Sequence, residues 1–495
     1  MLKELIIALL GIAPLGSLLI FLLFAAFAIY IVYQTQFHPL AAYPGPFLAK
    51  LTNLYSVVHA FRADRHEDLY QLHQYYRRIV RIGPQRLSIL DAQALAPIYG
   101  FQAMCKSLSG TTGSTALRGI EPHILSAIRD WCAALGDQHP DQLSPVAPSK
   151  SVGWSRPKNM AHWCAYGIFD ILGEVCFGKT FNTSLRDANH LFFPLMALNV
   201  QIINICGQMP ILRRLGFDDY LRMGTAADRE QQIAFSRKQL GARLTGNPTQ
   251  RRDIIYYLEQ ARDPQTGEGY NRGELISEAT MLLGAGIDTA NTALTATFYF
   301  LAHHPAILHR LTSAIRTAFP TLEDIVSGPR LTQLTYLYAC VEESMRLCPP
   351  VPMDLPREVL PGGLQVGSWH FPAGTIVGVP TYSLHHSEEY FDRPFVYDPS
   401  RWLLRASEGG EGVDTAVLRR QRKAFIPFSL GPRAFIGRDM AMLEVEVSLA
   451  RALWLYDMRL APGTEMLGVG KEGEYKIKDH FVVGKEGPVL QFRAR

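Results

Sequence analysis

The sequence predicts a mostly α-helical domain with a small β-sheet, joined to one N-terminal membrane helix. Residues 5–33 are uncharged and mostly apolar, long enough to cross a hydrocarbon core that needs about 20 residues. Residues 274–304 form a second long apolar stretch with little charge, which predicts a helix buried in the middle of the domain. Stretches of strand-forming residues are much shorter than these helical stretches, as at 87–89, so we expect a small sheet.

The composition indicates one large domain with a sizeable core. The chain has 495 residues, 48% of them apolar, and a formal net charge of +4. So small a charge argues against a nucleic-acid partner. The seven cysteines form no CxxC pair and no zinc-type spacing, so reduced, buried thiols in a cytosolic domain are the simplest interpretation. His385 and His386 are adjacent and point apart, so we expect no joint metal site.

The N-terminal apolar stretch has two interpretations, a membrane anchor and a cleaved signal peptide. It is too long for a signal peptide, and it continues through 30–33, Tyr-Ile-Val-Tyr, without a small-residue cleavage site. Aromatic residues near its end suit a membrane interface, and Lys50 and Arg62 follow on the expected cytosolic side. We therefore expect a single-pass anchor with the start of a hinge at 1–36 and one cytosolic domain at 37–495.

The central apolar helix contains a polar pair, Asp288 and Thr289, shortly after Ala285 and Gly286. A glycine inside a helix costs roughly 0.5 to 1 kcal/mol relative to alanine, so Gly286 indicates a packing or functional requirement. The polar pair alone is a weak signal, because threonine commonly hydrogen-bonds to the preceding helical turn.

A second helix ends within 342–350, which reads Glu-Glu-Ser-Met-Arg-Leu-Cys-Pro-Pro. Glu343 and Arg346 are three residues apart, so they share a helix face and can pair. The two prolines end the helix. The pair alone is also compatible with an ordinary exposed ion pair.

A loop rich in glycine and proline at 427–438 leads into an apolar helix and reads Pro-Phe-Ser-Leu-Gly-Pro-Arg-Ala-Phe-Ile-Gly-Arg. Together with the two preceding motifs, in this order, it resembles the haem-binding loop of a cytochrome P-450. That pattern is Phe, two residues, Gly, one residue, Arg, one residue, Cys, one residue, Gly. The positions that match are Phe428, Gly431, Arg433 and Gly437. Phe435 stands at the position of the Cys.

The resemblance covers almost the whole chain and is closest to fungal microsomal enzymes that tailor terpenoid, polyketide or alkaloid products. It implies the cytochrome P-450 fold, haem b as the cofactor, and monooxygenation of a small apolar substrate with NADPH-derived electrons from a reductase. It also implies a location in the endoplasmic-reticulum membrane.

The resemblance assigns roles to the polar and small residues of the central helix. Ala285 and Gly286 would let a flat cofactor and dioxygen approach the helix backbone. Asp288 and Thr289 would act as the pair that relays protons to iron-bound oxygen.

The resemblance also assigns roles to three arginines and one glutamate. Glu343, Arg346 and Arg401 would form a buried cluster that locks the chain before the haem loop. Such a guanidinium–carboxylate network tolerates burial where an isolated charge would not. Arg433 and Arg357 would reach the haem propionates, although Arg357 is equally compatible with an exposed arginine on a strand.

Two features depart from the family pattern. Phe435 has no lone pair to offer iron, whereas the family ligand is a thiolate whose electron donation favours O–O cleavage. No cysteine follows position 348. Residues 104–119 run through a polar loop into the next helix, so we expect the propionate-binding helix of the family to be missing, with Arg118 as a candidate substitute.

Three hypotheses remain open at this point. The first, which we prefer, is a degenerate family member that cannot perform thiolate-haem oxygenation and is inactive or retained as a binding or scaffolding partner. The second is a haem-free cyclase or isomerase in which the Asp288–Thr289 pair acts as an acid. The third is an active monooxygenase with unusual haem ligation, which the retained motif residues favour.

Overall fold

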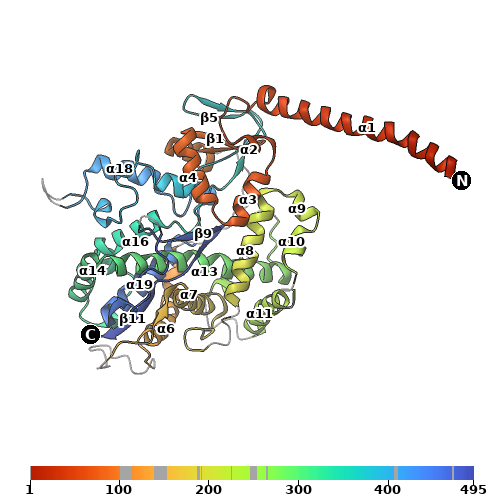
Figure 1. Cartoon of the computed structure of the whole chain (residues 1–495). Helices are drawn as coiled ribbons and strands as arrows, with labels where there is room; N and C mark the ends of the chain where they lie inside the picture. The colour runs from red at the N-terminus through yellow and green to blue at the C-terminus, as the bar shows by residue number, and fades with distance from the viewer. Residues whose placement is uncertain are drawn as a thin grey trace.

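The predicted architecture, a mostly helical domain with small sheets, is confirmed (Figure 1). The computed structural model describes residues 2–100, 114–138, 153–186, 190, 192–223, 226–245, 253–263, 266–405, 411–470 and 473–495. In Figure 1, α1 projects away from the body of the molecule, and α13 passes through the middle of that body.

The helices up to the central one include α1 (Leu2–Val32), the π-helical turn η1 (Tyr33–Phe37), α2 (Phe47–Leu51), α3 (Leu54–Arg62), α4 (Arg65–Tyr76), η2 (Ala92–Ala94), α5 (Leu95–Tyr99), α6 (Ser114–Leu135), α7 (Met160–Phe177), α8 (Phe192–Gln208), α9 (Ile211–Arg214), α10 (Phe217–Leu221), α11 (Ala226–Thr245), α12 (Ile254–Gln260) and α13 (Arg272–His303). The later ones include α14 (Pro305–Ala318), η5 (Leu322–Asp324), α15 (Pro329–Thr332), α16 (Thr335–Leu347), α17 (Thr381–His385), η6 (Pro399–Trp402), α18 (Thr415–Ala424), η7 (Gly431–Arg433) and α19 (Arg438–Leu455).

The strands form four small sheets within the described part of the chain. The largest has the order β1-β2-β7-β4, with β2 and β7 parallel and the other pairs antiparallel. The others have the orders β3-β11-β8, β10-β9 and β5-β6. The strands are β1 (Ile79–Gly83), β2 (Arg86–Ile89), β3 (Lys158–Asn159), β4 (Arg357–Glu358), β5 (Leu364–Val366), β6 (Trp369–Phe371), β7 (Ile376–Gly378), β8 (Tyr456–Leu460), β9 (Ile477–His480), β10 (Val482–Lys485) and β11 (Val489–Ala494).

The central helix α13 begins at a capping box. The Asn271 side chain accepts the backbone N–H of Glu274, and the Glu274 carboxylate accepts the N–H of Asn271. These two bonds satisfy backbone donors that the first helical turn leaves without partners. Every residue from Ala290 to Leu301 is buried, as expected for an apolar helix in the middle of a domain.

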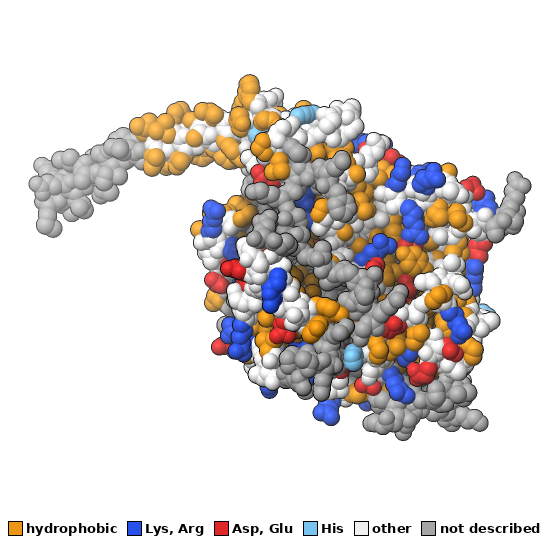
Figure 2. Space-filling model, turned by 180° about the vertical axis from the view of Figure 1, so that it is seen from behind, with side chains coloured by type: hydrophobic (Ala, Val, Ile, Leu, Met, Phe, Trp, Pro, Cys, Tyr) orange, Lys and Arg blue, Asp and Glu red, His pale blue; other side chains and the backbone are white. Residues whose placement is uncertain are grey.

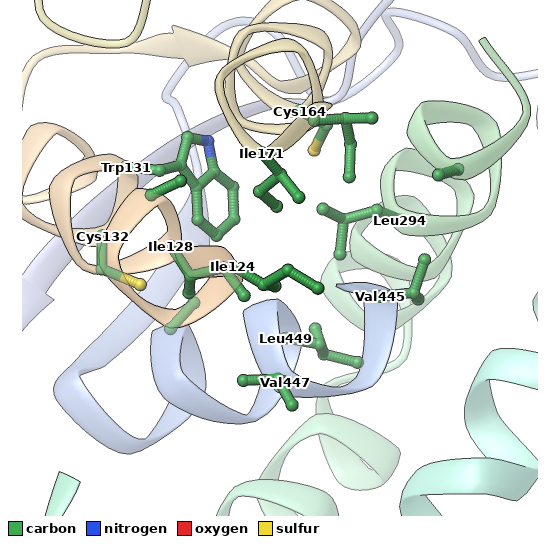
Figure 3. Packing of buried hydrophobic residues seen from close by; sticks show 14 of the residues in the cluster. Ile124, Ile128, Trp131, Cys132, Cys164, Ile171, Leu294, Val445, Val447 and Leu449 are labelled. Carbon is green, nitrogen blue, oxygen red and sulfur yellow. The ribbon is translucent and has the colours of Figure 1, made fainter. Parts of the chain in front are cut away.

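The main core forms where α6, α7, α13 and α19 meet (Figure 3). Side chains from all four helices point toward one another there, among them Ile128, Trp131, Ile171, Leu294 and Leu449. The packing of α19 against α13 is important for the site, because these two helices bound it from different sides. The second half of α13, from Ala290 to Leu301, is stable in this position because its whole surface is covered.

The projecting helix has the length and composition of a membrane span. Ser17–Phe37 has a mean hydropathy of 2.2, and Figure 2 shows apolar side chains along its described part. Its end is tied to the domain by Arg81 of β1, which is 0% exposed. Arg81 donates to the Gln34 carbonyl at 2.8 Å, to Gln34 Oε1 at 2.6 Å and to the Pro84 carbonyl at 2.7 Å.

Candidate functional site

A cavity of about 250 Å³ lies between α13, the start of α19 and the loop at 426–435. Its wall is mostly apolar. The described lining residues are Tyr99, Ala285, Thr289, Ala290, Ala293, Met345, Pro350, Val351, Leu355, Val379, Thr381, Ile426, Pro427, Phe428, Ser429, Arg433, Phe435, Ala441, Met442, Phe481 and Val482. Three segments that the sequence analysis identified as functional candidates, around residues 288, 346 and 433, therefore meet at one cavity.

The glycine-punctuated loop makes one wall of the cavity. Gly431 has φ +70°, and a Cβ there would lie 2.0 Å from the Tyr99 carbonyl, so only glycine fits without a shift of the loop. The Phe435 N–H donates to the Phe428 carbonyl at 2.9 Å. The two phenyl rings stack with centroids 6.1 Å apart, and both line the cavity. A Cβ at Gly437 would lie 3.2 Å from the Phe435 ring.

The opposite wall is the small-residue face of α13. Ala285 and Thr289 line the cavity, and the Thr289 hydroxyl donates to the Ala285 carbonyl at 2.8 Å. Gly286 faces elsewhere, since a Cβ there would lie 2.9 Å from Leu172 of α7. The close neighbour of this glycine is thus the helix α7 and not the cavity.

Asp288 is absent from the described cavity wall, although Thr289 beside it lies there. On the Asp288 side of α13, the half-buried Lys485 of β10 donates to the Thr292 hydroxyl at 2.9 Å. Burial raises the pKa of Asp288, an effect that nearby Lys485 opposes. Burial lowers the pKa of Lys485, which Asp288 opposes in turn. The two halves of the predicted relay pair therefore face different surroundings.

The structure brings Glu343, Arg346 and Arg401 together in a buried cluster. Arg346 donates to the two carboxylate oxygens of Glu343 at 2.9 and 2.8 Å, and Arg401 Nε donates to Oε1 at 2.9 Å. Trp402 Nε1 donates to Oε2 at 2.9 Å. Arg346 also donates to the Pro394 carbonyl at 2.6 Å, so the cluster fixes the segment before η6. Charge-assisted bonds to every carboxylate oxygen make this burial tolerable.

The two predicted anion contacts differ in position. Arg433, in η7, is exposed and lines the cavity. Arg357, in β4, is half-buried and does not belong to the described cavity wall. Its guanidinium donates to the Pro356 carbonyl at 3.0 Å and lies 5.2 Å from the ring centre of Tyr99.

Comparison with known proteins identifies the family. The model of the Cytochrome P-450 family matches residues 114–472. The chain is 33% identical to the cytochrome P-450 monooxygenase apf7 of Gibberella fujikuroi, over 97% of this chain and 98% of that protein. It is also 33% identical to AKT7 of Alternaria alternata, over 94% of each, and 32% identical to poxM of Penicillium oxalicum, over 94% and 92%; both are named cytochrome P-450 monooxygenases.

The chain belongs to the cytochrome P-450 family. The expected family and fold are therefore confirmed, and the family implies a haem cofactor. In a cytochrome P-450 the iron is held by a cysteine thiolate. The cavity wall between Phe428 and α13 has the apolar character that a porphyrin face requires, and Arg433 supplies a cation beside it.

The donor set of this cytochrome P-450 cavity does not fit a thiolate-bound iron. Phe435, which the sequence pattern predicts at the ligand position, presents a hydrocarbon ring, and no cysteine is among the described lining residues. Cys340 and Cys348 are buried outside the described lining, and burial raises the pKa of each to about 12, so they remain thiols. The sulfur atoms that the described wall does contain belong to the thioethers of Met345 and Met442.

Several features of the site have no signal in the sequence. Tyr99 and Phe481 reach the cavity wall from elements far away along the chain, and Lys485 reaches the Asp288 side of α13 in the same way. Nothing in their local sequence marks these three residues. Burial raises the pKa of Tyr99, whose hydroxyl accepts the Val379 N–H at 3.0 Å, so this phenol stays protonated. We predicted from the sequence that the propionate-binding helix is missing at 104–119. Residues 104–113 and the side chain of Arg118 lie outside the described part of the chain, so this prediction is not tested.

Proposed function

We propose that this chain is a membrane-anchored cytochrome P-450 homologue that does not perform thiolate-haem monooxygenation and instead binds a small apolar molecule. One observation supports the proposal: the ring of Phe435, the residue that the family pattern predicts at the ligand position, forms part of the cavity wall. A phenyl ring has no lone pair, so it cannot supply the electron donation on which O–O cleavage depends.

Retention of the cavity and of the buried charge cluster supports a binding role over simple loss of the fold. Glu343, Arg346 and Arg401 keep their full set of contacts, and the cavity keeps an apolar wall. A protein with this fold and a helix of membrane-spanning composition would act at the endoplasmic-reticulum membrane. We propose that it binds intermediates of fungal secondary metabolism there, or scaffolds the related enzymes that process them.

Two alternatives keep an enzymatic role. An active monooxygenase with unusual ligation, supplied with electrons by an NADPH-dependent reductase, is supported by the Met345 and Met442 thioethers on the wall. A haem-free cyclase or isomerase needs an acid at the cavity. Thr289 lies there and Asp288 does not, so this second alternative has the weaker support.

The absorption spectrum of the purified full-length protein tests the proposal. We expect no thiolate-type Soret band, and no carbon-monoxide difference band typical of a cysteine-bound haem, in the unmodified chain. Phe435→Cys is expected to restore both if the remaining cavity can hold haem. Ile436→Cys is the matched control, because it adds a thiol one residue further on, at a side chain outside the described cavity wall.

The possible outcomes separate the hypotheses. A thiolate-type spectrum in the unmodified chain would contradict the proposal outright. A haem spectrum without thiolate character, combined with product formation in the presence of a reductase, would favour the monooxygenase with unusual ligation. Product formation without reductase or haem would favour the cyclase or isomerase.

A further inference from the structure

We propose that the outer face of the β3-β11-β8 sheet binds an extended acidic segment of a partner protein. We call this surface the arginine face, and it consists of Trp154, Arg156, Arg459, Gln491 and Arg493. It belongs to a different part of the fold from the cavity, so its failure would leave the proposed function intact.

The arginine face is the solvent side of the strand pair β8 and β11. Met458 and Phe492 point into the core, with exposed fractions of 8% and 2%. Successive side chains of a strand point to opposite sides, so Arg459, Gln491 and Arg493 point away from the core, and both arginines are exposed. In Figure 1, β11 and the C-terminus lie on the side of the molecule away from α1. A partner would therefore approach this face from the cytosol.

The two strand arginines are held in place by a tryptophan ring. The segment before β3 runs beside β11, where the Ser155 N–H donates to a carbonyl of that strand at 2.7 Å. This places the Trp154 ring 4.2 Å from the guanidinium carbon of Arg459 and 4.7 Å from that of Arg493. Arg459 also donates to Gln491 Oε1 at 3.2 and 2.9 Å. Guanidinium groups that are already ordered lose little side-chain entropy on binding, and Trp and Arg are the residue types that dominate binding energy at interfaces.

The arginine face has fewer acidic than basic side chains around it. Asp137 accepts from Lys158 at 2.7 Å and from Arg156 at 3.4 Å. Asp457 accepts from Arg316 at 3.1 Å and from Arg493 at 3.3 Å. Each of these carboxylates is thus shared by two cations. Among the described residues, no carboxylate pairs with Arg459, whose acceptor is the neutral amide of Gln491. A carboxylate from a partner would supply the missing negative charge.

The spacing of the two strand arginines matches an extended peptide. Arg459 lies opposite Gln491 and Arg493 lies opposite Asp457, so the two arginines are diagonal neighbours across the strand pair. Diagonal neighbours are about 7–8 Å apart. Side chains at alternate positions of an extended peptide lie about 6.6 Å apart on one side. A peptide with acids at alternate positions can therefore place one carboxylate at each guanidinium.

The test uses a defined acidic peptide and the full-length protein in phosphatidylcholine nanodiscs. The probe is a fluorescein-labelled peptide of about twelve residues in which Glu and Ser alternate, and the control peptide has Gln in place of Glu. Binding is followed by fluorescence anisotropy at about 50 mM and about 300 mM salt. The variants are Arg459→Gln, Arg493→Gln and the double variant. The matched control is Arg419→Gln combined with Arg420→Gln, which removes two exposed arginines from α18.

We expect the acidic peptide to bind at low salt and the Gln peptide not to bind. Each single variant should weaken binding by about threefold and the double variant by about tenfold, because each removes one charge-assisted pair. The α18 variant should change the dissociation constant by less than about twofold. Arg459 is exposed and bonded only to an amide, so its replacement should leave the fold intact.

Three results would overturn the inference. One is no binding of the acidic peptide at low salt. Another is binding that the double variant leaves unchanged, which would place the peptide on a different surface. The third comes from vesicles containing phosphatidylserine, added to the protein in nanodiscs. If the double variant lost vesicle binding but kept peptide binding, the arginine face would be a lipid surface.

Discussion

Replacing Glu343 with glutamine is expected to destabilise the fold strongly, whether or not a cofactor binds. The Glu343 carboxylate is 0% exposed and accepts bonds from Arg346, Arg401 and Trp402. Glutamine keeps the shape but removes the charge and turns one acceptor into a donor, which leaves two buried guanidinium groups without a counter-ion. Breaking such a buried network costs about 3–5 kcal/mol.

The expected shift in melting temperature follows from the size of the domain. Unfolding entropy near 60 °C is roughly 2.1 cal/mol/K per residue, so a domain of about 460 residues has roughly 1 kcal/mol/K in total. Glu343→Gln should therefore lower the apparent melting temperature by about 4 °C. Circular dichroism at 222 nm on the full-length protein in detergent would measure it.

The matched control is Glu411→Gln. Glu411 pairs with Arg310 in the open, with side chains 50% and 45% exposed. Exposed pairs contribute about 0–1 kcal/mol, so this substitution should lower the melting temperature by less than about 1 °C. If Glu343→Gln shifted the temperature no more than Glu411→Gln, the cluster would not support the fold as argued.

Three further predictions concern the loop, a buried acid and the anchor. Gly431→Ala should destabilise the protein by about 3 kcal/mol in thermal unfolding, and the control Gly463→Ala by about 1 kcal/mol. The backbone angle φ is positive at both positions, but only at Gly431 would the new Cβ also overlap a backbone carbonyl of α5. Burial raises the pKa of Glu444 to about 8. The native state thus keeps a proton that the unfolded chain releases above about pH 4.3, so stability should fall between about pH 5 and 8 by up to about 1.4 kcal/mol per pH unit. Glu444→Gln should flatten that slope in denaturation measured across pH, and an unchanged slope would refute the assignment. Arg81→Met removes the guanidinium donors that hold Gln34, so limited proteolysis should cut the hinge after η1 faster than in the unmodified protein. An equal rate of cleavage would show that the bonds from Arg81 do not hold the end of the membrane helix against the domain.

The buried cluster illustrates what local sequence can predict. The spacing of Glu343 and Arg346 is enough to place both side chains on one helix face. Arg401 could be assigned only by resemblance to the family, and the bond from Trp402 could not be assigned at all. Loop residues acquire neighbours only when the chain folds back, so no periodicity in the sequence reports their contacts.

The loop at 427–438 shows the same division. Its glycines and prolines predict a tightly turned segment, and its resemblance to the family pattern predicts that Phe435 stands at the ligand position. The structure adds that Phe435 stacks on Phe428 and that two methionine thioethers share the cavity wall. Those neighbours come from α16 and α19, which pack beside the loop only in the folded domain.

The sequence by itself determined the apolar N-terminal helix, the buried central helix and the identity of residue 435, because length, hydropathy and residue type are properties of the chain alone. Only the tertiary structure decided which face of α13 meets the cavity. Thr289 lies on that wall, whereas Asp288 lies on the side of Lys485. An all-round apolar helix gives no amphipathic pattern to distinguish its buried faces, and the partner lysine is 193 residues from Thr292, whose hydroxyl it binds.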